Sequence, residues 1–181
     1  MDGTGETNGL RTLDVDEIAD TIESIGFECT RCGDCCRGHE GEHTATVSPA
    51  EVRALRRSDE EWKDVARPVP FGLTDGEGET FEWALQTDRC GDCVFFDDGG
   101  AQGTCSVYDD RPRICRTYPF SLEVNGTEPY GAVVDRQGPV RVHECEGLGR
   151  PISRKDAEAL ARGLIARVYD EIQERRAVLA Q

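Results

Sequence analysis

The sequence has very little lysine and no long apolar run. Of its 21 basic residues only Lys63 and Lys155 are lysine, and 36 acidic residues give the 181-residue chain a formal net charge of −15. Such an acidic surface repels nucleic-acid phosphates and anionic lipid headgroups. No segment approaches the ~20 consecutive apolar residues that a membrane-spanning helix needs. We therefore expect neither a nucleic-acid partner nor a membrane partner.

The amino-terminal region also lacks the features of a secretory signal. Residues 1–11 are polar, without the basic start and apolar stretch of a signal peptide, and we expect them to form a flexible tail. We therefore expect a cytoplasmic protein, with one domain over residues 12–181, a length that suits a single domain.

The acidity itself has more than one interpretation. Abundant carboxylates with almost no lysine are typical of a surface adapted to a salt-rich cytoplasm, where ions screen the repulsion between acidic groups. This halophilic interpretation is the one we favour. An ordinary acidic surface, or an acidic face that meets a basic protein partner, is the alternative.

Capping residues and apolar spacing predict four helices. We expect one after Asp14, two short ones over about 49–57 and 59–66, and a long C-terminal packing helix over 153–178. Each begins with a side chain that can cap the first turn, and apolar residues follow at helical spacing in the first and last of them.

Turn residues predict three short hairpins, over residues 71–85, 94–108 and 121–134. The third is expected to turn at Asn125-Gly126, a pair that favours a two-residue hairpin loop. Helices and hairpins together indicate a small, loop-rich α+β domain. Such a domain has little regular core and needs cross-links to be stable.

Nine cysteines can supply those cross-links. A reducing cytoplasm disfavours disulfides, and an odd number excludes complete internal pairing, so we interpret the thiols as metal ligands or catalysts. The densest group is Cys29-Thr-Arg-Cys32-Gly-Asp-Cys35-Cys36. Two-residue spacing lets thiolates converge on one ion, as in zinc knuckles and iron–sulfur loops.

The adjacent pair Cys35 and Cys36 favours two metal centres over one. Neighbouring side chains of an extended chain point to opposite faces, so the two thiols suit two nearby centres better than one. The other cysteines are Cys90, Cys93, Cys105, Cys115 and Cys145. Their wide separation means that a bound metal closes long loops, so we expect metal binding and folding to be coupled.

Arginines adjoin these cysteines in the sequence. A zinc ion held by four thiolates keeps a net charge of about −2, which nearby cations can balance. The candidates are Arg31, Arg37, Arg89, Arg111, Arg113 and Arg116. Pairing of the same arginines with surface acids is an equally open interpretation.

Histidine is scarce, and familiar catalytic motifs are missing. We expect His39 and His43 to lie in a solvated loop, whereas His143, near Cys145, is a candidate substitute ligand or a support for one. The sequence has no phosphate-binding loop, no dinucleotide-binding glycine pattern, no nucleophile elbow and no H-E-x-x-H helix.

The order and spacing of the cysteine motifs resemble a known family, the YkgJ-type cysteine-cluster proteins with a CxxCxxCC zinc- or iron-chelating domain. The resemblance covers residues 29–149. It is carried by Cys29-x2-Cys32-Gly33-x-Cys35-Cys36-Arg37, Cys93-x-Phe95-Phe96, Cys105-x2-Tyr108-x2-Arg111-Pro112-x2-Cys115-Arg116-x-Tyr118-Pro119-Phe120 and Cys145-x-Gly147-x-Gly149.

The resemblance implies a metal-binding protein whose cofactor is zinc or iron, the latter as a 4Fe-4S cluster. The ligands that it implies are Cys29, Cys32, Cys35, Cys36, Cys93, Cys105, Cys115 and Cys145. Cys90 is an extra beside this usual set of eight and is the ninth candidate.

The resemblance also leaves the biological role open. It extends to the flagellin lysine N-methylase FliB, which implies an iron–sulfur-dependent enzyme related to protein lysine N-methylases as an alternative to a metal-binding protein alone. A zinc-stapled protein-interaction module is the third interpretation. The sequence does not decide whether the protein is an enzyme.

Overall fold

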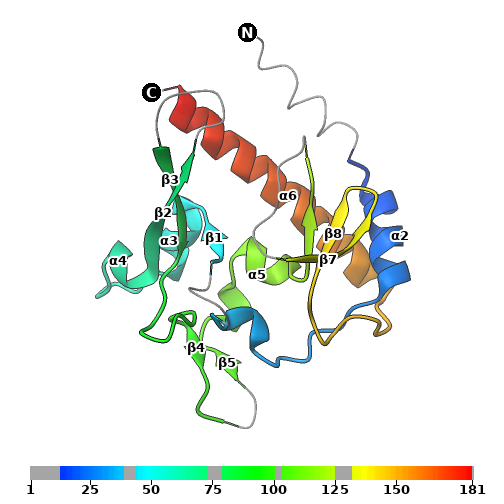
Figure 1. Cartoon of the computed structure of the whole chain (residues 1–181), viewed down its shortest axis with the longest axis horizontal. Helices are drawn as coiled ribbons and strands as arrows, with labels where there is room; N and C mark the ends of the chain where they lie inside the picture. Colours follow the sequence, from blue (N-terminus) through cyan, green and yellow to red (C-terminus); the bar gives the residue numbers. More distant parts are fainter. Residues whose placement is uncertain (1–12, 39–43, 73–78, 101–102, 125–131, 181) are drawn as a thin grey trace. The chain divides into compact units, whose positions relative to one another are not determined.

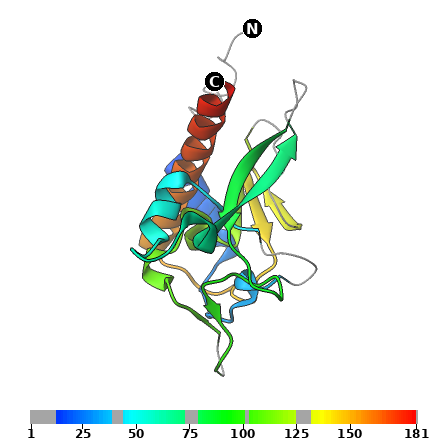
Figure 2. The ribbon, with the colours of Figure 1, turned by 90° about the vertical axis from the view of Figure 1, so that its left-hand side faces the viewer.

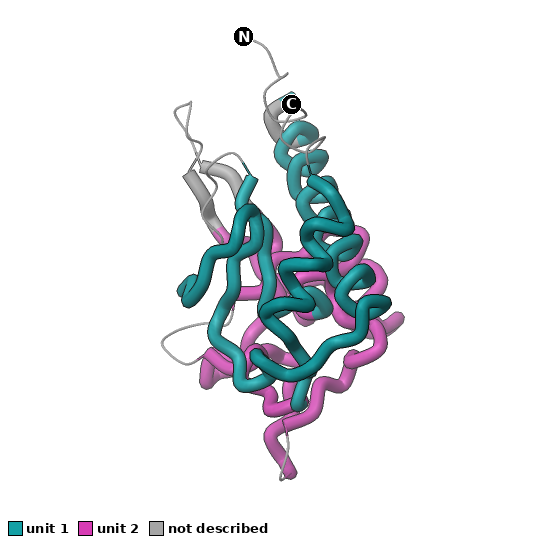
Figure 3. Tube along the Cα trace, turned by 90° about the vertical axis from the view of Figure 1, so that its right-hand side faces the viewer, with its two compact units in different colours: residues 1–30, 116–181 teal, residues 31–115 magenta. Residues whose placement is uncertain are grey.

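The computed structural model of the chain describes residues 13–38, 44–72, 79–100, 103–124 and 132–180. Helices and short antiparallel sheets alternate along the chain, which confirms the expected α+β class (Figure 1). The chain forms two compact units, which we call unit 1 (Met1–Thr30 and Arg116–Gln181) and unit 2 (Arg31–Cys115) (Figure 3). The single domain over 12–181 stays a prediction, and the tail over 1–11 lies outside the described residues.

Unit 1 combines helices with an antiparallel sheet. Its elements are α2 (Val15–Ile25), β6 (Phe120–Leu122), β7 (Val133–Gln137), β8 (Val140–His143) and α6 (Arg154–Leu179). The carboxylate of Asp14 accepts hydrogen bonds from the backbone N–H groups of Asp16 and Glu17, which confirms the predicted cap of α2. The predicted C-terminal helix is also confirmed as α6, the long red helix of Figure 2.

The core of unit 1 lies between α2, α6 and the sheet. Ile18 and Ile22 of α2, Leu164 of α6, and Phe120 and Val140 of the sheet are almost completely buried there. Burial of side chains this large contributes about 1.5–3 kcal/mol each relative to leaving them exposed.

The strand pairing of unit 1 differs from the expected hairpin over 121–134. The strand order is β6-β8-β7, so β6 pairs with β8 and β7 does not pair with β6. Val140 and Val142 are buried, whereas the middle of β7 is exposed, so burial places β8 at the centre of the sheet. The tight turn lies at Gly138, where φ is +56°; Asn125-Gly126 lies outside the described residues.

Unit 2 is built from shorter elements. They are η1 (Asp34–Cys36), β1 (Thr46–Val47), α3 (Pro49–Leu55), α4 (Trp62–Val65), β2 (Ala66–Gly72), β3 (Glu79–Leu85), β4 (Phe96–Asp97), β5 (Thr104–Cys105), η2 (Tyr108–Asp110) and the start of α5 (Arg113–Thr117). The expected pairings over 71–85 and 94–108 appear as β2–β3 and β4–β5, and β1 adds a third strand beside β3.

Local capping explains where the helices of unit 2 begin. Ser48 and Glu51 form the predicted capping box at the start of α3. The second helix begins later than expected, because Glu61 and Asp64 form its capping box, while the carboxylate of Glu60 accepts from the backbone of Arg57. The second helix is therefore α4, shorter than the predicted 59–66.

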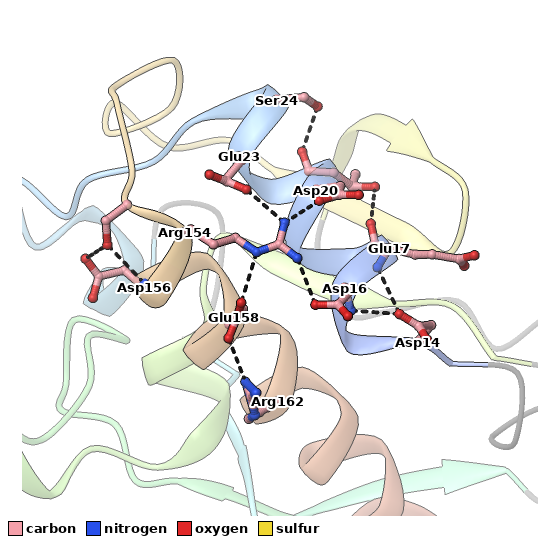
Figure 4. Close-up of polar contacts among 12 residues, drawn as sticks. Asp14, Asp16, Glu17, Asp20, Glu23, Ser24, Arg154, Asp156, Glu158 and Arg162 are labelled. Atoms are coloured by element: carbon pink, nitrogen blue, oxygen red, sulfur yellow. Dashed lines mark hydrogen bonds and ion pairs between the residues drawn. The ribbon is translucent and has the colours of Figure 1, made fainter.

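One arginine of unit 1 joins the acidic face of α2 to α6. The guanidinium of Arg154 contacts Glu23 (2.9 Å), Asp16 (2.8 Å) and Asp20 of α2, and Glu158 of α6 (3.0 Å) (Figure 4). These hydrogen bonds, led by the one to Glu23, raise the pKa of Arg154 above its ordinary value. One cation therefore faces four carboxylates at this surface.

Within the described part of the chain, no helix combines the length and the apolar character that crossing a membrane requires. The long helix α6 carries charged side chains along its length, several of them in ion pairs with one another.

Candidate metal centre

The cysteine-rich loop of unit 2 turns sharply at Gly33. This glycine has φ of +83° and precedes η1, and its carbonyl accepts a hydrogen bond from the backbone N–H of Cys36 (2.9 Å). A left-handed conformation of this kind costs little for glycine and much more for other residues. The glycine thus permits the tight turn between Cys32 and Cys35.

Phe96 of β4 packs against this turn and against the next hairpin. A Cβ atom at Gly33 would lie 2.5 Å from the Phe96 ring, and a Cβ atom at Gly103 would lie 2.3 Å from it. The guanidinium of Arg37 lies 4.9 Å from the ring centroid and is itself bound by both carboxylate oxygens of Asp98. The ring therefore holds the cysteine loop against β4 and β5.

Backbone pairing brings further cysteines to the same place. The N–H of Cys93 donates to the carbonyl of Cys36 (2.8 Å), and Cys105 pairs with Phe96 across β4 and β5. Cys93 is buried in the core of unit 2, and Cys36 and Cys115 pack against that core. Three separate stretches of sequence thus deliver thiols to one region.

The thiols of this region perturb one another. A hydrogen bond with the Cys36 thiol raises the pKa of Cys35 well above its ordinary range, and burial and the charge of Cys36 add to the rise. Burial raises the pKa of Cys93 to about 11, with contributions from Cys105 and Cys35. Burial also raises the pKa of Cys115 strongly, with contributions from Cys93, Cys35 and Cys105.

This mutual repulsion is the property that a bound cation would relieve. Four thiolates close together are unstable in the absence of a positive charge, and soft sulfur ligands favour zinc or iron. No three histidine, cysteine, aspartate or glutamate side chains of the described residues already stand as a ready metal site. The soft thiol donors of this region are of the chemical type that zinc or iron prefers.

Cys35 and Cys36 do not lie in an extended segment, as the sequence argument assumed. Cys35 and Cys36 lie in the 3₁₀ turn η1, and their thiols are hydrogen-bonded to each other. The interpretation that they point to opposite faces is therefore wrong, because that argument holds only for an extended backbone. Both thiols belong to the group in unit 2.

Arg111 adds a positive charge near these thiols. Its Nε donates to the carbonyl of Tyr108 (2.8 Å), and its guanidinium lies 3.6 Å from the centroid of the Tyr108 ring. From this position it lowers the pKa of both Cys35 and Cys115, opposing the effects of burial. Charge compensation, one of the two interpretations of the arginines, thus has structural support at Arg111, whereas Arg37 pairs with an acid.

A second guanidinium lies on the same tyrosine ring. The Cζ atom of Arg31 is 4.2 Å from the centroid of Tyr108, and Arg31 has a left-handed backbone with φ of +58°. Sequence reasoning missed this role of Tyr108. The sequence contains one indication of this role: Tyr108 lies three residues before Arg111, and a 3₁₀ turn such as η2 places side chains at this spacing on the same side.

The remaining cysteines have different surroundings. Cys32 is partly buried in the loop before η1, and Cys90 is exposed in a turn where its backbone N–H donates to Asp88 (2.8 Å). Cys29 and Cys145 belong to unit 1, where Cys29 is exposed and the sulfur of the half-buried Cys145 accepts from the N–H of Gly147 (3.4 Å). The thiols whose charges perturb Cys35, Cys93 and Cys115 are all members of unit 2.

His143 has a structural role. Its Nδ1 donates to the carbonyl of Ala132 (3.0 Å), so its Nε2 accepts from the hydroxyl of Ser121 (2.9 Å), an assignment that follows from the hydrogen bonds. Burial lowers its pKa and favours the neutral ring. Both nitrogens are occupied, so His143 is not the substitute ligand that its position suggested. His39 and His43 lie outside the described residues.

Comparison with known families gives one match. The model of the CxxCxxCC family, described as a "putative zinc- or iron-chelating domain", matches residues 28–166. The match covers well over half of the chain, and the chain belongs to this family. Neither the curated proteins nor the solved structures contain a match to it.

Proposed function

We propose that the protein binds zinc or an iron–sulfur cluster through four thiolates of unit 2, those of Cys35, Cys93, Cys105 and Cys115. The observation that carries the proposal is the backbone arrangement of unit 2, in which Cys93 N–H donates to the carbonyl of Cys36 (2.8 Å), Cys105 pairs with Phe96, and Cys115 packs against the core that contains Cys93. The mutual effect of these thiols on one another's pKa supports it. Cys36 supports the set by its hydrogen bond to Cys35. Four thiolates are a sufficient ligand set for either a zinc ion or a 4Fe-4S cluster.

The position of the centre supports a structural contribution by the metal. Cys93 belongs to the buried core of unit 2, and Cys36 and Cys115 pack against it. A metal bound there would replace part of the core that a loop-rich unit of this size lacks, so its binding free energy would also stabilise the fold. This supports a metal-stapled module, and it requires the reduced thiols that a cytoplasmic location maintains.

Metal analysis of anaerobically purified protein tests the proposal. We expect zinc in stoichiometric amount, or iron with acid-labile sulfide and a broad visible absorption that is lost in air. Cys90→Ser is the matched control, because Cys90 lies outside the proposed set and is not among the thiols that perturb Cys35, Cys93 or Cys115, so its variant should keep the wild-type metal content. A folded protein that contains neither zinc nor iron would contradict the proposal, and loss of metal in Cys90→Ser would make Cys90 a ligand.

We also infer that the acidic surface is adapted to high salt. Support comes from the net charge of −15 and from Arg154, whose one guanidinium contacts four carboxylates of α2 and α6. In low salt these carboxylates repel one another, and in molar salt the Debye length falls to about 3 Å and screens them.

The salt dependence of Arg154→Gln tests this inference. We expect its melting temperature to fall below that of the wild type at low KCl, because four carboxylates lose their shared cation. The deficit should shrink in molar KCl. Arg162→Gln is the control, since Arg162 contacts only Glu158 (3.3 Å) among the ion pairs of this surface. A wild-type protein that is most stable at low salt, or a deficit independent of KCl, would contradict salt adaptation.

A further inference from the structure

Two arginine side chains of unit 2 meet on one tyrosine ring. The Cζ atom of Arg31 lies 4.2 Å from the centroid of the Tyr108 ring, and the Cζ atom of Arg111 lies 3.6 Å from it. The two guanidiniums are therefore no farther apart than the sum of these distances. Each cation is attracted to the electron-rich ring, and this attraction opposes the repulsion between the two charges. The ring thus holds two positive charges together.

Arg31 is held there in a backbone conformation that its residue type disfavours. Its φ is +58°, and among the described residues it is the one non-glycine residue with a positive φ. A Cβ atom makes this conformation costly, and such strain is typical of functional positions. The strained backbone and the stacking on Tyr108 together fix where the guanidinium of Arg31 lies.

The guanidinium of Arg31 is exposed and faces no carboxylate. Within the part of the chain that the structure describes, its one side-chain contact is the Tyr108 ring, with neither an ion pair nor a hydrogen bond. The chain contains 36 acidic residues, so arginines that pair with acids are easily formed, as Arg37 and Arg154 are. Arg31 instead presents its N–H donors to solvent beside a second cation.

Tyr108 adds a third donor group to the two guanidiniums. Its half-buried side chain carries a hydroxyl for which the described ranges of the chain supply no hydrogen-bond partner. Arg111 is fixed against the same ring, because its Nε donates to the Tyr108 carbonyl (2.8 Å). A phenol O–H donates readily to an anion, and each guanidinium presents planar N–H donors that match the oxygens of a phosphate group.

We propose that Arg31, Tyr108 and Arg111 form a binding site for a phosphate group, carried by free phosphate or by a small phosphomonoester. The two positive charges match a phosphate dianion. A bound phosphate also relieves the repulsion between the guanidiniums, and their fixed positions reduce the ordering that binding requires. The site uses none of the cysteines, so it does not rest on the proposed function.

Calorimetric titration of the full-length protein with inorganic phosphate tests the site. Arg31→Gln should lower the affinity about tenfold or more, because charge-assisted hydrogen bonds are lost, and Tyr108→Phe should lower it less, because the ring remains. Arg53→Gln is the matched control and should bind as the wild type does. Arg53 is an exposed arginine of α3 in the same unit and has no ion pair with a described residue.

Arg31→Gly separates binding from folding. Glycine adopts a φ of +58° without strain, which offsets the loss of the stacking on Tyr108. This variant should therefore melt at the wild-type temperature and yet lose phosphate affinity as Arg31→Gln does. Both variants should keep the wild-type metal content, since every cysteine stays in place. The titrations are made in KCl that screens the net charge of −15, which otherwise repels any anion.

Two further anions complete the test. Acetate carries a single charge and should bind at least about tenfold more weakly than phosphate. Methyl phosphate should bind as tightly as phosphate if the site serves a phosphomonoester, and more weakly if it serves free phosphate.

Four results would overturn the site. They are a wild type that binds no phosphate at millimolar concentration, equal affinity of the wild type and Arg31→Gln, an equal loss in Arg53→Gln, and acetate that binds as tightly as phosphate. Loss of metal from Arg31→Gln together with its phosphate affinity would also contradict the site, because binding would then depend on the thiols. A wild type without zinc or iron overturns the proposed function and leaves the phosphate site untouched.

Discussion

Gly33→Ala is expected to destabilise unit 2 by about 2–5 kcal/mol and to reduce its metal content sharply. Two costs combine at this position. The left-handed backbone, with φ of +83°, costs about 1–2 kcal/mol for a residue with a Cβ atom, and insertion of a methyl group 2.5 Å from the Phe96 ring adds about 1–3 kcal/mol. Displacement of the turn would also move Cys35 and Cys36 away from Cys93.

A double-mutant cycle with Phe96→Leu separates these costs. Gly103→Ala has only the steric cost, since its Cβ atom would lie 2.3 Å from the same ring. Phe96→Leu should therefore rescue most of the stability lost in Gly103→Ala and only part of that lost in Gly33→Ala. Chemical denaturation and metal analysis measure both effects. Equal rescue of the two glycine variants would show that backbone strain at Gly33 contributes little.

The features predicted correctly from the sequence depend on residues a few positions apart. The Asp14 cap, the Ser48 capping box and the long C-terminal helix each follow from side chains within one or two helical turns. The start of α4 was predicted too early because two acidic patterns lie side by side. Glu61 and Asp64 form the capping box, whereas Glu60 binds the backbone N–H of Arg57 instead. The position of β8 as the central strand of its sheet could not be predicted from neighbouring residues in the sequence. It depends on packing of the sheet against α2 and α6, which are distant in the chain.

The candidate site likewise combines a feature that is visible in the local sequence with one that depends on tertiary packing. Spacing predicts that the cysteines are metal ligands, since C-x2-C and its neighbours carry the chemistry in the sequence itself. Which cysteines share one region depends on tertiary structure, because Cys93 and Cys105 come near the loop of Cys36 only when β4 and β5 pair and Phe96 packs on Gly33. The eight-ligand set of the sequence stays a prediction.

Gly147→Ala is expected to separate residues 26–30 of unit 1 from residues 145–150, which are joined by hydrogen bonds from Glu28 N–H to the Gly147 carbonyl and from Gly149 N–H to the Gly26 carbonyl (3.0 Å each), and to destabilise the unit. The added Cβ atom would lie 2.3 Å from the carbonyl oxygen of Glu28 and 3.0 Å from the Phe27 ring. The nearer atom belongs to the backbone and cannot rotate away, so the two segments must separate. We expect a loss of stability of about 3 kcal/mol, at the upper end of overpacking effects, which chemical denaturation measures.

Gly138→Ala is the matched control for this variant. Gly138 lies in the same unit with φ of +56°, but no atom lies within 4 Å of its added Cβ, so only the backbone conformation is strained, at about 1–2 kcal/mol. Chemical denaturation should therefore show a larger loss of stability in Gly147→Ala than in Gly138→Ala, because only the former adds a collision with a backbone atom. Equal losses in the two variants would contradict this account, since they would show that the close approach of Gly147 to the Glu28 carbonyl costs little.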